Sequence, residues 1–222
     1  MWRAMSQPYD PAPATPREPM FNAPAPVLAV VAAIVAGYAA QSLLASGVDW
    51  GLRGGVSGEA LRDGRWWSPL TALFIHGGWS HALMNALGAL AFGAPVARLL
   101  AGRGGGAALF YLFYVVTGLV ANLGYAVLNW NSAVPAVGAS GAVLGLMGAA
   151  SRLLFTPPGA LWPVFSRIPL SMAAAMAIIS FLIWVTGITP GMPGAVVAWE
   201  AHLFGYLAGL LLIGPFARLA GR

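Results

Sequence analysis

Long apolar runs alternate with short polar segments along most of this 222-residue chain. An α-helix needs about 20 apolar residues to cross the hydrocarbon of a bilayer, and six runs reach or approach that length. The pattern predicts an all-α polytopic membrane protein. Its spans are expected at residues 26–45, 79–100, 107–128, 138–154, 169–188 and 195–216.

The segments outside these runs differ in composition. Residues 1–25 are polar and rich in proline, which predicts a disordered cytosolic tail, and residues 218–222 form a short cytosolic C-terminus. The first apolar run is too long for a signal peptide, and further spans follow it. Residues 46–78 mix charges of both signs with three tryptophans, a residue type that is typical of the headgroup level. We expect these residues to form an ordered loop in the outer interface.

Composition agrees with a membrane protein, because 59% of the residues are hydrophobic and only 8% are charged. The net charge of +5 comes from arginines that stand singly between apolar runs. They therefore indicate topology rather than binding to nucleic acid. Most of them fall on the side of the two termini in a six-span arrangement. This bias predicts a multi-pass membrane protein with both termini in the cytosol. The lack of a large extra domain suggests a compact, bacterial-type protein, and hence a bacterial inner (plasma) membrane.

Missing residue types narrow the possible chemistry. The chain has no cysteine, which excludes disulfides, thiolate metal sites and a cysteine nucleophile. It has no lysine, which excludes a Ser-Lys dyad. Its three histidines do not form a His-Glu-x-x-His zinc motif, so we expect no metal and no cofactor. A serine nucleophile would have to pair with a histidine.

Four polar side chains fall within the predicted spans, where such groups are costly. Ser140 opens the fourth span, and His202 lies in the outer part of the sixth. His81 and Asn85 lie four residues apart near the start of the second span, so they share one helix face and can donate to one point. All four are expected at the outer ends of their helices.

Small residues offer a way to bring the fourth and sixth spans together. Glycine stripes allow two helix backbones to approach closely. If these stripes pack against each other, Ser140 and His202 meet within hydrogen-bond reach. The stripes comprise Gly141, Gly145 and Gly148 in the fourth span, and Gly205 and Gly209 in the sixth.

Each of these features alone also has a plainer interpretation. Ser140 stands among small residues that are common at helix contacts. His81 and Asn85 fit an interhelical hydrogen bond, and His202 fits a structural donor or a proton relay. His76 fits a loop or turn histidine better than a site residue. The shared depth of the polar groups on three spans favours a catalytic site.

Three motifs resemble the rhomboid intramembrane serine proteases, and residues 66–79 resemble the family's segment before its second span. The resemblance covers residues 26–217 and implies a six-transmembrane-helix bundle with a membrane-embedded first outer loop. It implies a serine endopeptidase that cleaves transmembrane segments of membrane proteins near the outer membrane face. The alternative is a catalytically silent rhomboid-like protein that binds such segments. The motifs are Gly138-Ala139-Ser140-Gly141, His81-Ala-Leu-Met-Asn85 and Ala201-His202-Leu-Phe-Gly205-Tyr-Leu-Ala-Gly209.

The resemblance also implies a role for individual residues. Ser140 would be the nucleophile and His202 the general base. The oxyanion hole would comprise His81, Asn85 and the backbone N–H of Ser140. Close-packing positions would be Gly138, Gly141, Gly205 and Gly209. The gate would comprise Phe181, Trp184 and Met84, and residues 187–197 would form a cap.

The dyad that the resemblance implies also has support from helix geometry. Glu200, the acid nearest to His202 in the sequence, lies about 200° around a helix from it and is poorly placed to orient the imidazole. Two positions depart from the family. Leu144 stands where an aromatic residue usually supports the histidine, and Ser68 stands where arginine commonly follows tryptophan. The partners implied are transmembrane substrates and the lipid bilayer.

Overall fold

The computed structural model describes residues 22–44, 47–100, 106–187 and 197–222, and the structural statements below concern these residues. They form a bundle of α-helices with one isolated antiparallel β-bridge, between Val56 and Ala136. Each predicted apolar run overlaps with one of the long helices. These are α1 (Ala25–Leu44), α5 (Trp79–Leu100), α6 (Gly106–Leu128), α7 (Ser140–Ser151), α8 (Arg167–Thr186) and α9 (Trp199–Leu219).

By length and composition, four of the described helices could cross a membrane, whereas the sequence predicts six spans. These four are α1, α5, α6 and α9. α7 has only 12 residues, or about 18 Å of helix, compared with about 30 Å of hydrocarbon. It ends at Ser151, and the side chain of Arg152 donates to the carbonyls of Trp162 and Leu210. The apolar part of α8 is also short, Arg167–Ile183.

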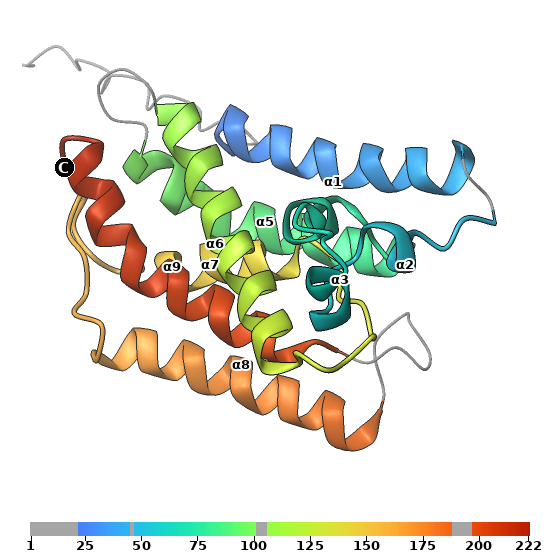
Figure 1. Cartoon of the computed structure of the whole chain (residues 1–222). Coiled ribbons are helices and arrows are strands. Elements are labelled where there is room, and N and C mark those ends of the chain that lie inside the picture. The colour runs from blue at the N-terminus through green and yellow to red at the C-terminus, as the bar shows by residue number, and fades with distance from the viewer. Residues whose placement is uncertain (1–21, 45–46, 101–105, 188–196) are drawn as a thin grey trace, which may run out of the picture.

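α7 lies in the middle of the bundle, among α5, α6 and α9 (Figure 1). Nine of its 12 residues are buried, and most of these are glycine or alanine. Small side chains let the neighbouring helices approach α7 from three sides. A Cβ atom at Gly145 would lie 2.5 Å from Thr117 of α6, and one at Gly88 of α5 would lie 2.6 Å from Val143.

α1 and α8 lie at opposite edges of the bundle (Figure 1). α1 packs on α5, where Val27 fills the space beside Gly93. α8 is attached mainly by its first half, where Pro169 and Met176 are buried. The beginning of α1 and the end of α9 lie at the same end of the bundle (Figure 1).

Residues 47–78, between α1 and α5, contain several short helices, which agrees with the ordered loop that the sequence predicts here. Asn122 of α6 donates to the Pro69 carbonyl over 2.7 Å, and Thr71 donates to the Gly54 carbonyl over 2.7 Å. Trp66 is 69% exposed, which suits a side chain at a lipid interface. The helices are α2 (Trp50–Gly54), α3 (Gly58–Arg62), α4 (Ser68–Thr71) and the 3₁₀ helix η1 (Ala72–Phe74).

Candidate active site

Ser140 is the first residue of α7, directly after a tight turn at Gly138 and Ala139. The turn is tied to the end of the first loop, because the Gly138 N–H donates to the Ala72 carbonyl over 2.8 Å. The Ala139 N–H points at Nε2 of His76, 3.4 Å away. As the first N–H of a helix, that of Ser140 has no intrahelical acceptor, and it makes no hydrogen bond within the described ranges.

The family resemblance implies that Gly138 packs two helices together, but the structure places this glycine in a turn. It precedes α7 and has a φ of +118°, a conformation that favours glycine. A Cβ atom there would lie 2.6 Å from Cε1 and Nε2 of His81 and 3.7 Å from Nδ2 of Asn85. The missing side chain therefore makes room for His81 and Asn85 beside the turn that carries Ser140.

Hydrogen bonds orient both of these side chains. The Gly77 N–H approaches Nδ1 of His81 at 3.4 Å, so a neutral imidazole carries its proton on Nε2, the atom that faces Gly138. Nδ2 of Asn85 donates to the His81 carbonyl over 3.0 Å, and its second proton is left for another acceptor. Asn85 is only 5% exposed. Two side-chain donors thus lie beside the start of α7.

α7 and α9 are in backbone contact along both glycine stripes. A Cβ atom at Gly205 would overlap the Gly141 carbonyl, and one at Gly209 would overlap the Gly145 carbonyl. The same contact continues to Gly148, where a Cβ atom would overlap the Tyr206 carbonyl. The backbones of these two helices can therefore approach only because side chains are absent on both.

This contact places Ser140 and His202 at the same level of the bundle. A Cβ atom at Gly141 would lie 3.8 Å from the carbonyl of Ala201, so the neighbours of Ser140 and His202 are close together. Among the described residues, Ser140 and His202 make no hydrogen bond with each other. Such bonds are often long before a substrate binds.

Glu200 lies near His202 in the sequence but has another partner. Its carboxylate accepts a hydrogen bond of 3.2 Å from Asn129 at the end of α6. Leu144, the departure from the family pattern, packs against a cluster that contains Met176 and Tyr206. Within the described ranges, no three His, Asp or Glu side chains are grouped so that they could hold a metal ion.

His76 is the site neighbour that the sequence did not identify. It is 1% exposed, and its ring lies 5.1 Å from that of His81. The Gln41 side chain holds the His76 backbone from α1, donating to its carbonyl over 2.7 Å and accepting from its N–H over 3.1 Å. The spacing of five residues would separate His76 from His81 on one helix, but His76 precedes α5 and can turn back toward it.

His76 should make folding stability depend on pH. Burial, with a smaller contribution from His81, lowers its pKa from 6.5 to about 4, although the Phe74 carbonyl opposes the shift. Between these pH values the unfolded chain binds the proton and the folded chain does not, so stability falls as the pH drops from 6.5 to 4. We expect about 2 kcal/mol less stability at pH 5 than at pH 7.5 from this group.

The measurement is denaturant unfolding in micelles at both pH values for the wild type and for His76→Gln. The variant should lose about that much of the pH dependence, whatever its stability at pH 7.5. An equal pH dependence in the two proteins would show that His76 is not the group responsible.

The proposed gate residues stand on two helices at the bundle surface. Met84 of α5 is 61% exposed and Phe181 of α8 is 59% exposed. Trp184 lies in α8 near its end. Most of the proposed cap, residues 188–196, lies outside the described residues. The second half of α8 is thus a surface element, and a role as a gate remains a prediction.

Together, the bundle and its polar cluster define a helical integral membrane protein with a serine, two histidines and an asparagine gathered at the beginnings of three helices. The family model of the Rhomboid domain matches residues 63–218, which is more than half of the chain. The chain therefore belongs to the rhomboid family, as its motifs suggested.

Three relatives illustrate the relationship. The candidate rhomboid protease YdcA of Bacillus subtilis (strain 168) is 29% identical over 150 residues, which cover 68% of this chain and 67% of YdcA. The rhomboid protease GluP of the same organism is 31% identical over 96 residues, or 43% of this chain and 17% of GluP. RHOMBOID-like protein 5 of Arabidopsis thaliana is 28% identical over 159 residues, or 72% of this chain and 47% of that protein.

Proposed function

We propose that this rhomboid is an intramembrane serine endopeptidase that cleaves transmembrane segments near the outer membrane face through a dyad of Ser140 and His202. The proposal includes six spans with both termini in the cytosol. The observation that carries it is the backbone contact between α7 and α9, which sets Ser140 and His202 at one level beside His81 and Asn85. Family membership and relatives that are named as proteases support it.

In this mechanism, the neutral imidazole of His202 takes the proton of the Ser140 hydroxyl while Oγ attacks the scissile carbonyl carbon. The imidazolium then gives the proton to the leaving amine, and an acyl-enzyme remains. Water then enters, gives a proton to His202 and attacks the ester carbonyl carbon. The ester bond breaks, His202 returns the proton to Oγ of Ser140, and the new carboxyl end is released. Glu200 takes no part, because its carboxylate is engaged with Asn129.

Negative charge on the carbonyl oxygen would be stabilised by three donors. These are Nε2–H of His81, the second N–H of Asn85 and the backbone N–H at the start of α7. Such donors act best when they are fixed before the reaction, and the hydrogen bonds from Gly77 and to the His81 carbonyl fix the first two. The positive end of the α7 dipole adds to the same effect.

A substrate span must expose its scissile carbonyl, which a helix keeps in a hydrogen bond. We therefore expect substrates with small or helix-weakening residues near the outer interface. The partly exposed second half of α8 is the proposed way in from the lipid, past Met84 and Phe181.

Labelling with a fluorophosphonate tests the enzyme against a silent binding protein. In the purified wild-type protein, Oγ of Ser140 should attack the phosphorus of the probe, lose its proton and displace fluoride. The phosphonyl group on Ser140 is located by peptide mass spectrometry. Ser140→Ala should not be labelled, whereas Ser151→Ala, which changes a serine of the same helix, should be. An unlabelled wild type would favour the alternative of a rhomboid-like protein that binds transmembrane segments without cutting them.

Asn85→Ala should leave weak activity. Loss of one oxyanion donor typically lowers the rate by about 10²–10³-fold, and the nucleophile and base remain. The measurement is the cleavage rate of a reconstituted membrane substrate, with Asn131→Ala in the exposed loop after α6 as a control of matched chemistry. An unchanged rate for Asn85→Ala would remove this residue from the oxyanion hole.

A further inference from the structure

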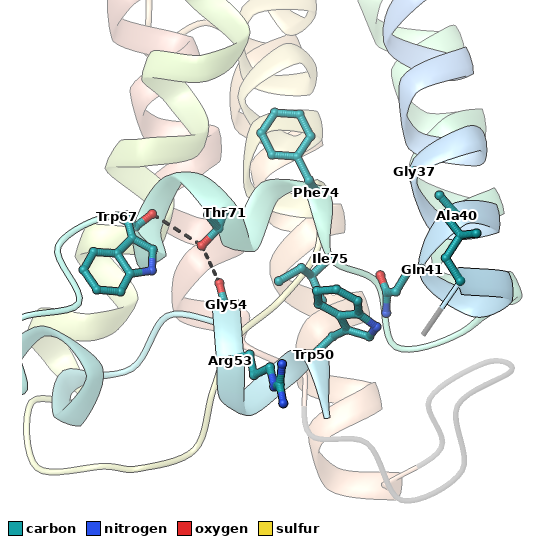
Figure 2. A pocket seen from close by; sticks show the side chains of 11 residues that line it. Gly37, Ala40, Gln41, Trp50, Arg53, Gly54, Trp67, Thr71, Phe74 and Ile75 are labelled. Carbon is teal, nitrogen blue, oxygen red and sulfur yellow. Dashed lines mark hydrogen bonds between the residues drawn. The ribbon is translucent and has the colours of Figure 1, made fainter. Parts of the chain in front are cut away.

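A cavity of about 670 Å³ lies between α1 and the first loop, on the side of α1 rather than of α8. Figure 2 shows its walls: Ala40 and Gln41 come from α1, and Phe74 and Ile75 from the end of the loop. Its volume falls in the range of pockets for small ligands, about 300–1,000 Å³. None of the proposed catalytic residues lines it.

The cavity is mostly apolar, and several of its apolar side chains are exposed at the surface of the bundle. Phe74 and Trp67 line it and are 55% and 57% exposed, and Leu44 at the end of α1 is 84% exposed. Side chains of this kind on a membrane protein contact acyl chains. An elongated apolar ligand from the bilayer can therefore enter without crossing water.

Two hydrogen-bond donors of the cavity have no partner within the described ranges. Arg53 makes no ion pair or hydrogen bond there, whereas Arg65 donates to the Leu52 carbonyl and Arg62 donates to Asn131. The indole nitrogen of Trp50 is buried without an acceptor, a state that costs about 1–3 kcal/mol. Both donors stand on α2, three residues apart and thus on one face.

The other polar groups of the cavity are already satisfied. The Gln41 amide is bonded twice to the His76 backbone, and the Thr71 hydroxyl donates to the Gly54 carbonyl. The cavity has a long apolar surface. Beside that surface, its two donors lack a negatively charged acceptor. A glycerophospholipid with an anionic headgroup has both parts in one molecule.

We propose that this cavity binds one anionic glycerophospholipid. The phosphate contacts the Arg53 guanidinium and brings an oxygen to the Trp50 indole N–H, and an acyl chain lies against Phe74 and Ile75. The lipid then contacts Gln41, whose side chain holds the His76 backbone. The His76 ring in turn accepts from the Ala139 N–H, in the turn before Ser140. Lipid binding itself does not depend on protease activity.

Native mass spectrometry of the full-length protein, released from micelles, tests the site. Phosphatidylglycerol and phosphatidylcholine with the same acyl chains are added in turn. One phosphatidylglycerol per chain should be retained about fivefold better than phosphatidylcholine, as expected for one arginine near an anionic lipid. Arg53→Gln should abolish this preference, and Arg53→Lys should keep it.

Arg62→Gln is the matched control, because Arg62 lies on the neighbouring α3 and does not line the cavity. It should keep the fivefold preference. Ala40→Trp should fill the cavity and lower retention of both lipids, whereas Ala32→Trp on the exposed side of α1 should not.

Three outcomes would overturn the proposal. Equal retention of both lipids by the wild type would remove the charge recognition. An equal loss in Arg62→Gln and Arg53→Gln would assign the preference to general surface charge. Displacement of phosphatidylglycerol by equimolar inorganic phosphate would make free phosphate, not lipid, the ligand.

Discussion

Ser140→Ala is expected to abolish cleavage of a single-span substrate that is reconstituted with the purified protein in liposomes. The loss should be at least about 10⁴-fold, because removal of the nucleophile leaves only the binding and oxyanion contributions. His202→Ala should have a similar effect, since the serine hydroxyl is a weak nucleophile without a base. The assay measures the new carboxyl end of the product by mass spectrometry.

The double variant Ser140→Ala/His202→Ala should be no worse than either single variant, because the two residues act as a unit. Ser151→Ala should cleave at close to the wild-type rate, since Ser151 lies at the far end of α7 from Ser140, where its hydroxyl donates to the Gly148 carbonyl. Cleavage that persists in purified Ser140→Ala would show that Ser140 is not the nucleophile.

The second large effect is expected from Gly209→Val, which should prevent α9 from packing on α7. A Cβ atom at this position would overlap the Gly145 carbonyl. A backbone carbonyl cannot relieve the overlap by changing its rotamer, as a side chain could. Valine adds two further methyl groups at the same place. We expect a loss of at least about 3 kcal/mol in the free energy of unfolding, at the upper end for overpacked cores.

Gly214→Ala in the same helix is the matched control, because the nearest atom to its Cβ would be the end of the Arg152 side chain at 3.7 Å. Thermal unfolding in micelles, followed by circular dichroism, should show a large decrease in Tm for Gly209→Val and little change for Gly214→Ala. Equal melting of the two variants would mean that the contact between α7 and α9 is not what holds these helices together.

Much of the fold could be predicted from the sequence, because a membrane span must be long, apolar and helical. All six long helices begin and end within about four residues of the predicted runs. The sequence did not predict that α7 is too short to cross the hydrocarbon, because its run of 138–154 continues past the end of the helix at Ser151. Hydropathy records only how apolar a segment is, and the arrangement of Arg152 with Trp162 and Leu210 depends on residues that lie far apart in the chain.

The gathering of the polar residues was predictable for a related reason. Polar groups at membrane depth cost free energy unless they have partners, and glycines at helical spacing indicate close helix packing. Both are therefore easy to recognise in an apolar chain. Two features depend on the folded structure. Gly138 belongs to a turn that faces His81, and His76 reaches the site only because η1 and the loop after it reverse the chain. Neither follows from periodicity, which describes residues within one helix.

The shortness of α7 also bears on how the protein is made. A segment of 12 residues is too short to partition into the bilayer as a separate helix when it leaves the ribosome. Its stabilising contacts include the glycines of α9, which are synthesised later. We therefore expect α7 to complete its insertion only after α9 has been synthesised. Under the proposed function, assembly of the site would then be a late event in biogenesis, and a chain truncated before α9 would be inactive because it lacks His202.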